Sequence, residues 1–323
     1  MTGQRPWEPA CHADVLRLRA KLRQSIRRFF DHRRYLEVDT PLLSHDVVID
    51  AHLDPIETGV GRERLYLQTS PEAGMKRLLA AGSGSIWQLT RSFRQGESGD
   101  LHNPEFVMLE WYGVATTWRE QMQLTEALVQ QAATDLDASL KLGPADVLTY
   151  QQAFHRYVGI DPLAIEVQDL QQCVAEELHV PPPADRDDLL NLLLAEKIEP
   201  HLGKESPLFL IDYPASQAAL AELSEDDDRV AQRFELYVHG IEICNGYQEL
   251  TDAEELHKRE REQLQRRRQG GASQLPGAAM LLAAMEAGLT RCSGVALGFD
   301  RLLMLLTSQS TLDAVLPFPF DRA

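Results

Sequence analysis

The sequence lacks any long apolar run. No stretch approaches the ~18 consecutive apolar residues that a membrane-spanning helix needs. The N-terminal segment MTGQRPWEPACHADVLRLRA also has no apolar core followed by a small-residue cleavage site, which a secretory signal would show. From these absences we expect a cytoplasmic protein with no membrane association.

Cysteine is also scarce. The 323 residues include four cysteines, and none of them stands in a CxxC or Cys/His spacing. Neither a zinc site nor a disulfide framework is therefore indicated. We expect Cys11, Cys173, Cys244 and Cys292 to be reduced thiols with structural roles.

Basic residues are fewer than acidic residues. The chain has 32 lysines and arginines against 49 aspartates and glutamates, which gives a formal net charge of -17. That balance opposes broad electrostatic attachment to nucleic-acid backbones. Hydrophobic residues make up 44% and charged residues 25%, as in an ordinary folded protein, and the length suits two average domains or one large one.

The segment from Ser85 to Tyr112 carries the clearest pattern, because its second half alternates between two faces. One face holds Phe106, Met108, Glu110 and Tyr112, and the other holds Val107, Leu109 and Trp111. A carboxylate and a phenol on one face, with Arg94 before the connecting loop and Asn103 after it, indicate a ligand-binding pair of strands. By itself, however, the alternation is more typical of a hairpin with one solvated face.

The residues before this hairpin predict a long helix and a strand. Apolar residues at three- and four-residue steps predict a helix from His12 to about Arg34, whose other faces are basic. A strand from Tyr35 to Thr40 follows, and Pro41 stops it because proline has no N–H to donate. A long helix that leads into a strand in this way often lies at a dimer interface.

A second helix is predicted from Ser70 to about Ala81. Ser70, Pro71 and Glu72 supply an N-cap, a first-turn proline and a first-turn acid, so the start of the helix explains all three residues. Glu72 has an alternative use, since its carboxylate could receive a substrate ammonium.

A second hairpin is predicted between Phe234 and Cys244, with its turn at residues 239–240. In that register Tyr237 lies opposite Glu242, so Glu235 and Glu242 project from one face as diagonal neighbours. Two carboxylates there would repel each other on their own, but they could share Mg²⁺ when a phosphate completes the site.

The residues around this hairpin carry weaker signals. Asn245 and Glu249 flank Gly246, where a bulge could turn both side chains toward one pocket. Residues 144–206 consist of short helical pieces broken by prolines, as in an insertion on a sheet scaffold. Residues 253–269 carry charges of both signs and predict a solvated helix.

Near the C-terminus, residues 293–298 predict a strand and a tight turn, and Asp300 and Arg301 open a leucine-rich helix. An arginine in the first turn faces the positive end of the helix dipole, which costs ~0.3–1 kcal/mol when exposed. A bound polyphosphate would explain its presence there.

Three segments together carry a family resemblance: the helix and strand that end at Pro41, the hairpin with FRQGE and HNPEF, and ALGFDR at a late strand-to-helix junction. Their order and spacing resemble the three signature motifs of class II aminoacyl-tRNA synthetases. LQTSPE, HNPEF, GIEICNGYQEL and GVALGFDR resemble the lysyl group over nearly the whole chain. The resemblance implies an α+β fold with an antiparallel sheet flanked by helices, as one catalytic domain over 1–323 with a mostly helical insertion at about 144–206.

Lysyl-tRNA synthetases carry an N-terminal anticodon-binding barrel, whereas the first-motif helix begins here near His12. We therefore expect no tRNA-reading domain, and the chain is similar to the truncated paralogues of the elongation factor P lysine ligase family. That resemblance implies ATP-dependent activation of lysine, in particular (R)-β-lysine, as an aminoacyl-adenylate. It further implies transfer to a lysine side chain of elongation factor P, with Mg²⁺ and ATP, in a homodimer.

Two alternatives stay open. The chain could transfer lysine to tRNA or another small acceptor, although the acidic balance makes tRNA the poorer partner. It could also be a catalytically dead regulator that senses an amino acid. A dead paralogue is expected to lose its phosphate arginines and metal acids, yet Arg94, Arg301, Glu235 and Glu242 are all present.

The resemblance also implies roles for individual residues. The catalytic residues are Arg94 at the α-phosphate and Arg301 at the γ-phosphate. The ATP-binding set is Arg94, Gln95, Gly96, Glu97, His102, Asn103, Phe106, Glu242, Ile243, Gly298 and Arg301. The lysine-binding set is Ser70, Pro71, Glu72, Glu110, Tyr112, Asn245, Glu249 and Ala296, and the metal ligands are Glu235 and Glu242.

Three positions depart from the family pattern. The usual Arg-Asn-Glu is Arg94-Gln95-Gly96-Glu97 here, so the acid is displaced by one residue. Arg34 stands where first motifs usually have glycine. Ala296 stands where lysyl-tRNA synthetases have glycine, and its methyl group is expected to reshape the pocket toward β-lysine.

Overall fold

The structure is a computed structural model that describes residues 7–50, 53–140 and 142–323. The first six residues of the N-terminal segment, in which we expect no secretory signal, lie outside this part of the chain. The chain divides into two compact units. The first comprises residues 1–116, 127–141 and 251–323, and the second comprises residues 117–126 and 142–250.

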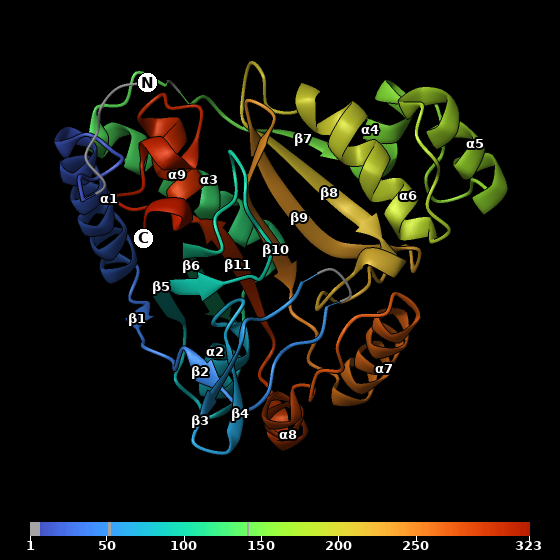
Figure 1. Cartoon of the computed structure of the whole chain (residues 1–323), viewed down its shortest axis with the longest axis horizontal. Coiled ribbons are helices and arrows are strands. Elements are labelled where there is room, and N and C mark those ends of the chain that lie inside the picture. Colours follow the sequence, from blue (N-terminus) through green and yellow to red (C-terminus); the bar gives the residue numbers. More distant parts are fainter. Residues whose placement is uncertain (1–6, 51–52, 141) are drawn as a thin grey trace. The chain divides into compact units, whose positions relative to one another are not determined.

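The first unit contains two groups of strands. The larger group, in the order β1-β5-β6-β11, comprises β1 (Leu36–Glu37), β5 (Ile86–Phe93), β6 (Glu105–Val114) and β11 (Cys292–Gly298). β1 runs parallel to β5, whereas β5, β6 and β11 are antiparallel neighbours. The smaller sheet, in the order β2-β4-β3, comprises β2 (Leu43–Ser44), β4 (Glu63–Leu67) and β3 (Glu57–Val60) (Figure 1).

The helices of this unit are α1 (Ala13–His32), α2 (Glu72–Ala80), α7 (Ala253–Gln269), α8 (Ala279–Gly288) and α9 (Phe299–Leu306), with short turns η4 (Leu312–Ala314) and η5 (Phe320–Arg322). α1 buries its apolar stripe on the strands. Phe30 stacks on Trp87 of β5 at 5.1 Å between ring centroids and lies 5.4 Å from Trp111 of β6. The α+β fold with antiparallel strands flanked by helices, predicted from the sequence, is confirmed.

The second unit contains β10 (Ile241–Gln248), β9 (Val230–Val238), β8 (Leu208–Pro214) and β7 (Asp146–Thr149), in that order. Its helices are α4 (Tyr150–Tyr157), α5 (Val167–Leu178), α6 (Arg186–Leu193), η1 (Leu194–Ile198), η2 (Glu199–His201) and η3 (Ala215–Gln217). α3 (Trp118–Leu136) contributes residues to both units. Residues 144–206 are mostly helical (Figure 1). Their apolar side chains form a buried cluster that includes Leu208, Leu210 and Tyr213 of β8.

Two local predictions are wrong. The bulge in β10 lies between Glu242 and Cys244 and not at Gly246, which pairs regularly with Phe234. α7 is not a fully solvated helix, because Glu260 and Arg267 are buried. The mixed charges of α7 concealed this burial, because the two side chains bond to groups outside the helix. Arg267 pairs with Asp54, and Glu260 accepts the N–H of Ala278.

The turn after α1 places Arg34 where glycine is usual. Arg34 N–H donates to Asp31 O at 3.0 Å and Tyr35 N–H donates to Phe30 O at 3.1 Å, the pattern of a Schellman motif. Arg34 occupies the left-handed position of this motif with a φ of 60°. Glycine is the usual residue there because it has no Cβ to strain the backbone.

We expect Arg34→Gly to raise the free energy of unfolding by about 0.5–1 kcal/mol, because the left-handed conformation penalises any residue with a Cβ. Urea unfolding followed by circular dichroism measures the change. Arg34→Ala is the matched control, since it removes the same exposed side chain but keeps the Cβ. An equal gain in both variants would contradict the backbone explanation.

Candidate active site

One face of β5, β6 and β11 combines polar groups with small residues. Residues directly opposite one another in antiparallel strands share a face, so each rung of the sheet can be followed across three strands. Glu110 pairs with Gln88 on β5 and with Ala296 on β11. β11 contributes Cys292, Gly294, Ala296 and Gly298 to this face, opposite Val114, Tyr112, Glu110 and Met108. β11 therefore contributes very little side-chain volume to this face of β5, β6 and β11, which we call the floor.

The polar face is also buried. Met108 is 7%, Glu110 1% and Tyr112 3% exposed, so the alternative interpretation of a solvated hairpin face is wrong. The opposite face carries the apolar core, as predicted, with Val107, Leu109 and Trp111 all at 1% exposure or less. A buried carboxylate on a strand surface costs free energy unless donors stabilise it.

The backbone at Gly298 does not itself require glycine. Its φ is -72°, and the three atoms nearest to a Cβ built there all belong to the Arg301 side chain, the closest at an ordinary van der Waals distance of 3.6 Å. The packing around Gly298 is therefore not tight enough to exclude a methyl group.

Glu110 is held by two neutral donors. Ser70 Oγ donates to Glu110 Oε1 at 2.6 Å, and Tyr112 Oη donates to Glu110 Oε2 at 2.9 Å. The same Ser70 hydroxyl accepts the Glu72 N–H at 3.0 Å, so it serves the start of α2 and the carboxylate together. These contacts bring Ser70, Glu72, Glu110 and Tyr112, four of the predicted lysine-binding residues, into one cluster.

Glu72 has a partner that the sequence analysis missed. Lys76 Nζ donates to Glu72 Oε1 at 2.6 Å, and the Lys76 side chain is 1% exposed. The two residues are four apart on α2 and therefore share a helix face, a spacing that could have indicated the pair. A substrate ammonium at Glu72 would share this carboxylate with Lys76.

The turn after β5 brings three predicted nucleotide-binding residues together. The Arg94 guanidinium lies 5.0 Å from the centroid of the Phe106 ring, and Arg94 Nη1 lies 3.5 Å from Glu97 Oε1. Gly96 has a φ of 81°, which lets the chain turn between Arg94 and Glu97. The displaced acid of this motif is thus within reach of the arginine it accompanies.

Arg301 contacts the loop that follows this turn. Arg301 Nε donates to Leu101 O at 3.2 Å, and Arg301 Nη2 lies 2.8 Å from His102 Nε2. Partial burial, followed by the positive charge of Arg301, lowers the pKa of His102. A neutral imidazole can accept from the guanidinium through Nε2, so the lowered pKa agrees with the short contact.

Asn103 is fixed from both ends of its amide. Nδ2 donates to Glu105 O at 2.6 Å, and Oδ1 accepts the Phe320 N–H of η5 at 3.0 Å. No pattern in the sequence predicts that the C-terminal turn reaches this loop.

Asp300 joins three segments that are distant in the sequence. Its Oδ1 accepts from Arg19 Nη1 of α1 at 2.5 Å, and its Oδ2 accepts from the backbone N–H of Val107 on β6 at 2.7 Å. Both Asp300 and Arg19 are buried. Asp300 immediately precedes Arg301, so this pair holds the start of α9 against the hairpin.

The remaining predicted residues, Glu235, Glu242, Ile243, Asn245 and Glu249, lie in the second unit. Glu235 accepts from Arg233 Nη2 at 2.5 Å and from Tyr237 Oη at 2.6 Å. Glu242 pairs with Tyr237, as predicted, and Asn245 pairs with Glu235. The bulge between Glu242 and Cys244 shifts the alternation by one residue, so Glu242 and Asn245 share the face of Glu235.

These side chains suit Mg²⁺ chemically. A carboxylate has about four lone-pair positions, so the two donors on Glu235 leave it able to bind a cation. Mg²⁺ in nucleotide sites is usually held by one or two carboxylates together with phosphate oxygens and water. Within residues 7–50, 53–140 and 142–323, no group of three or more metal-ligating side chains is present.

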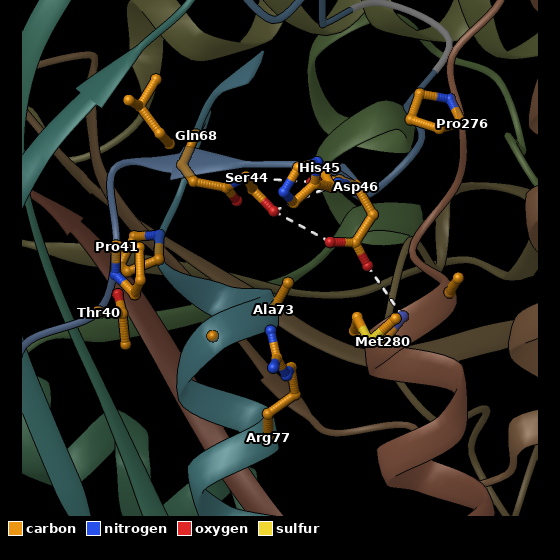
Figure 2. A pocket seen from close by; sticks show the side chains of 14 residues that line it. Thr40, Pro41, Ser44, His45, Asp46, Gln68, Ala73, Arg77, Pro276 and Met280 are labelled. Carbon is orange, nitrogen blue, oxygen red and sulfur yellow. Dashed lines mark hydrogen bonds between the residues drawn. The ribbon is translucent and has the colours of Figure 1, made fainter. Parts of the chain in front are cut away.

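One cavity, of about 490 Å³, lies elsewhere in the first unit, between residues 40–46, α2 and the start of α8 (Figure 2). Pro71 is the one predicted site residue among its lining residues. Asp46 accepts from Ser44 Oγ at 3.0 Å and from the Met280 N–H at 2.9 Å, which fixes the wall between β2 and α8. The cavity meets the face of α2 that carries Ala73 and Arg77, and Glu72 and Lys76 are on a different face of the helix.

No helix in the described part of the chain is both long enough and apolar enough to cross a membrane.

We expect Asp300→Asn to lower the free energy of unfolding by about 3–5 kcal/mol, because it leaves Arg19 as a buried charge without its counterion. Chemical denaturation of the single variants and of the double variant with Arg19→Met measures the coupling between the two residues. Glu37→Gln is the control, since it removes an exposed pair with Arg27 that is worth at most about 1 kcal/mol. Equal losses of unfolding free energy in Asp300→Asn and Glu37→Gln would show that the buried pair stabilises the fold no more than the exposed pair does.

Comparison with known proteins agrees with this arrangement. Residues 10–322 match the family "tRNA synthetases class II (D, K and N)". A protein of Edwardsiella ictaluri named "Elongation factor P--(R)-beta-lysine ligase" is 47% identical over the full length of both chains. Proteins of the same name from Salmonella arizonae and Salmonella dublin are each 46% identical, again over the full length of both chains. The chain belongs to the class II tRNA synthetase family, in the group of the D, K and N synthetases.

Proposed function

We propose that this chain activates lysine, as (R)-β-lysine, with ATP and ligates it to a lysine side chain of translation elongation factor P. The observation that carries the proposal is the floor of β5, β6 and β11, where a buried carboxylate stands beside Ala296 and Gly298. An acid fixed by two neutral donors suits the ammonium of a lysine-like substrate. The full-length relatives named for this activity support the same conclusion.

In this proposal the turn after β5 and the start of α9 bind the nucleotide. Arg94 contacts the α-phosphate, Arg301 contacts the γ-phosphate, and adenine stacks on Phe106. The cation–π contact of Arg94 with Phe106 supports the first of these roles, because it holds the guanidinium beside the ring on which adenine would lie. Gln95, Gly96, Glu97, His102, Asn103, Ile243 and Gly298 complete the ATP site.

The first step is adenylate formation. A carboxylate oxygen of the amino acid attacks the α-phosphorus of ATP, a new P–O bond forms, and the bond to pyrophosphate breaks. Negative charge on the transferring phosphoryl group increases in the transition state, so a guanidinium at the α-phosphate lowers the barrier. Arg94 is the residue that we assign to this task.

Mg²⁺, held by Glu235 and Glu242, would neutralise part of the polyphosphate charge when bound. Arg233 and Tyr237 orient Glu235 for that role through their contacts with its two oxygens.

The amino acid is selected by acids and by shape. Glu110 and Glu72 receive its two ammonium groups, and Ser70, Pro71, Tyr112, Asn245 and Glu249 complete the lysine set. Ala296 is opposite Glu110 in the strand register, so its methyl group occupies the floor next to the carboxylate. A substrate whose amino group is displaced by one carbon would be positioned differently over that methyl group than α-lysine would.

The second step transfers the acyl group. The neutral amine of the acceptor lysine attacks the carbonyl carbon of the adenylate, AMP leaves, and the amine gives up a proton. No covalent enzyme intermediate is required.

We further propose that the chain acts as a homodimer. Leu36, Leu43 and Met280 are exposed apolar side chains on β1, β2 and α8, and Leu43 and Met280 both line the cavity of Figure 2. Exposed apolar groups that gather around a cavity are typical of an interface between subunits. A mass of twice 36.3 kDa in sedimentation equilibrium is the expected result, and a single-chain mass would contradict it.

The acceptor is tested with the purified chain, ATP and either elongation factor P or total tRNA. We expect the intact mass of elongation factor P to rise by one lysyl group, with (R)-β-lysine giving faster transfer than α-lysine. Arg94→Ala is the negative control, because loss of a charge-stabilising donor costs about 10²–10³ in rate. Transfer to tRNA alone would contradict the proposal, and absence of lysine-dependent ATP–pyrophosphate exchange would indicate a dead regulator.

Two variants on β11, each of which changes one methyl group, test the lysine site and the ATP site separately. We expect Ala296→Gly to shift the preference between β-lysine and α-lysine by about 10-fold or more, since one methyl in a tight pocket is worth ~1–3 kcal/mol. Gly298→Ala, two residues along the floor, is expected to raise the KM for ATP and leave the preference between the lysine isomers unchanged. Steady-state ATP–pyrophosphate exchange measures both variants. An unchanged isomer preference in Ala296→Gly would refute the role of this methyl group.

A further inference from the structure

The guanidinium of Arg267 is buried in a place where the sequence indicates a solvated charge. Arg267 is the middle residue of three consecutive arginines in the last turn of α7, and its side chain is 1% exposed, whereas Arg268 is exposed. A buried arginine is costly unless its planar set of donors is well paired. Its partners therefore indicate what this residue does.

Those partners come from two segments on either side of the guanidinium. Nη1 donates to Asp50 O at 3.0 Å and to Leu53 O at 3.3 Å, and Nη2 donates to Asp54 Oδ1 at 2.5 Å. Ser273 O accepts from Nε at 3.4 Å and from Nη2 at 3.3 Å. One side chain thus ties the end of α7 and the residues after it to the segment that precedes β3.

The segment that Arg267 holds is in turn bonded to the turn after β5. The backbone N–H of Gln95 donates to Asp54 O at 2.8 Å. Two neighbouring bonds, from Phe93 N–H to Gln68 O and from Arg94 N–H to Pro104 O, fix the residues before it. The bond to Asp54 is the one nearest to Gly96, where the chain reverses before Glu97.

We propose that Arg267 is a positioning residue for nucleotide binding, which acts through Asp54 on the turn from Arg94 to Glu97. The inference rests on the proposed function, because it takes that turn to bind ATP. Arg267 does not touch the substrate. It fixes Asp54 through the carboxylate and through the neighbouring carbonyl groups, and Asp54 fixes the backbone of the turn.

Lysine cannot replace arginine in this role. Its ammonium has three donors around one point, whereas the guanidinium presents five donors in a plane and reaches two segments at once. Arg267→Lys therefore keeps the charge while it loses part of the pairing. Small displacements of a positioned phosphate-binding group have large effects on binding and rate.

The experiment compares Arg267→Lys with Arg268→Lys, a matched change at the exposed neighbour. Dissociation constants for ATP without lysine, and for lysine without ATP, are measured by titration calorimetry. We expect Arg267→Lys to weaken ATP binding on the order of tenfold and to leave lysine binding within about twofold, because the turn and the Glu110 cluster are held separately. Arg268→Lys is expected to match the wild-type chain for both ligands.

Equal weakening of ATP and lysine in Arg267→Lys, or unchanged ATP binding, would overturn the inference. If Arg267→Lys does not fold, Asp54→Asn replaces it, since this variant keeps the backbone oxygen and removes the ionic partner; unchanged ATP binding in that variant would overturn the inference equally. Lysine-dependent ATP–pyrophosphate exchange by the wild-type chain is measured in parallel. A wild-type chain that binds ATP but shows no exchange contradicts the proposed function and leaves the test of Arg267 valid.

Discussion

The buried ion pair between Asp300 and Arg19 is the contact on which the first unit most depends. It removes two charges from water, and it is compensated because Asp300 also accepts the N–H of Val107. Through these bonds, α1, β6 and α9 are held at one point, although residues 19, 107 and 300 are far apart in the chain. Arg301 follows directly, so the same contact fixes the position of the residue that we assign to the γ-phosphate.

The low side-chain volume of the floor follows from the residues of β11. Alternation places Val295 and Leu297 in the core, which leaves Gly294, Ala296 and Gly298 to face the polar side. Nothing in the backbone of Gly298 explains the absence of a side chain there. Packing requirements therefore account for one face of the strand, and we propose that the other face admits a substrate.

The sequence predicts the parts of this arrangement that depend on local periodicity. The alternation from Phe106 to Tyr112 and the pairing of Glu242 with Tyr237 both follow from residues close together in the chain. The family resemblance adds residue roles, and the cluster of Ser70, Glu110 and Tyr112 is consistent with the lysine set. The roles themselves stay predictions.

What the sequence does not predict is the pairing of buried charges across long separations. Arg267 and Glu260 have the same local surroundings as solvated helix residues, and only the fold brings Asp54 and the N–H of Ala278 to them. The position of the bulge in β10 was predicted wrongly for a similar reason. Gly246 permits an irregular backbone, but the partner strand determines where the extra residue lies, and it lies between Glu242 and Cys244.

We propose that one strand face receives adenine near Phe106 and the lysine ammonium near Glu110. A crystal structure with a non-hydrolysable β-lysyl-adenylate analogue tests this proposal most directly. We expect adenine against the Phe106 ring, the phosphate mimic at Arg94, and a side-chain ammonium within hydrogen-bond distance of Glu110. An analogue bound with its ammonium away from Glu110, or in the cavity beside Arg77, would contradict it.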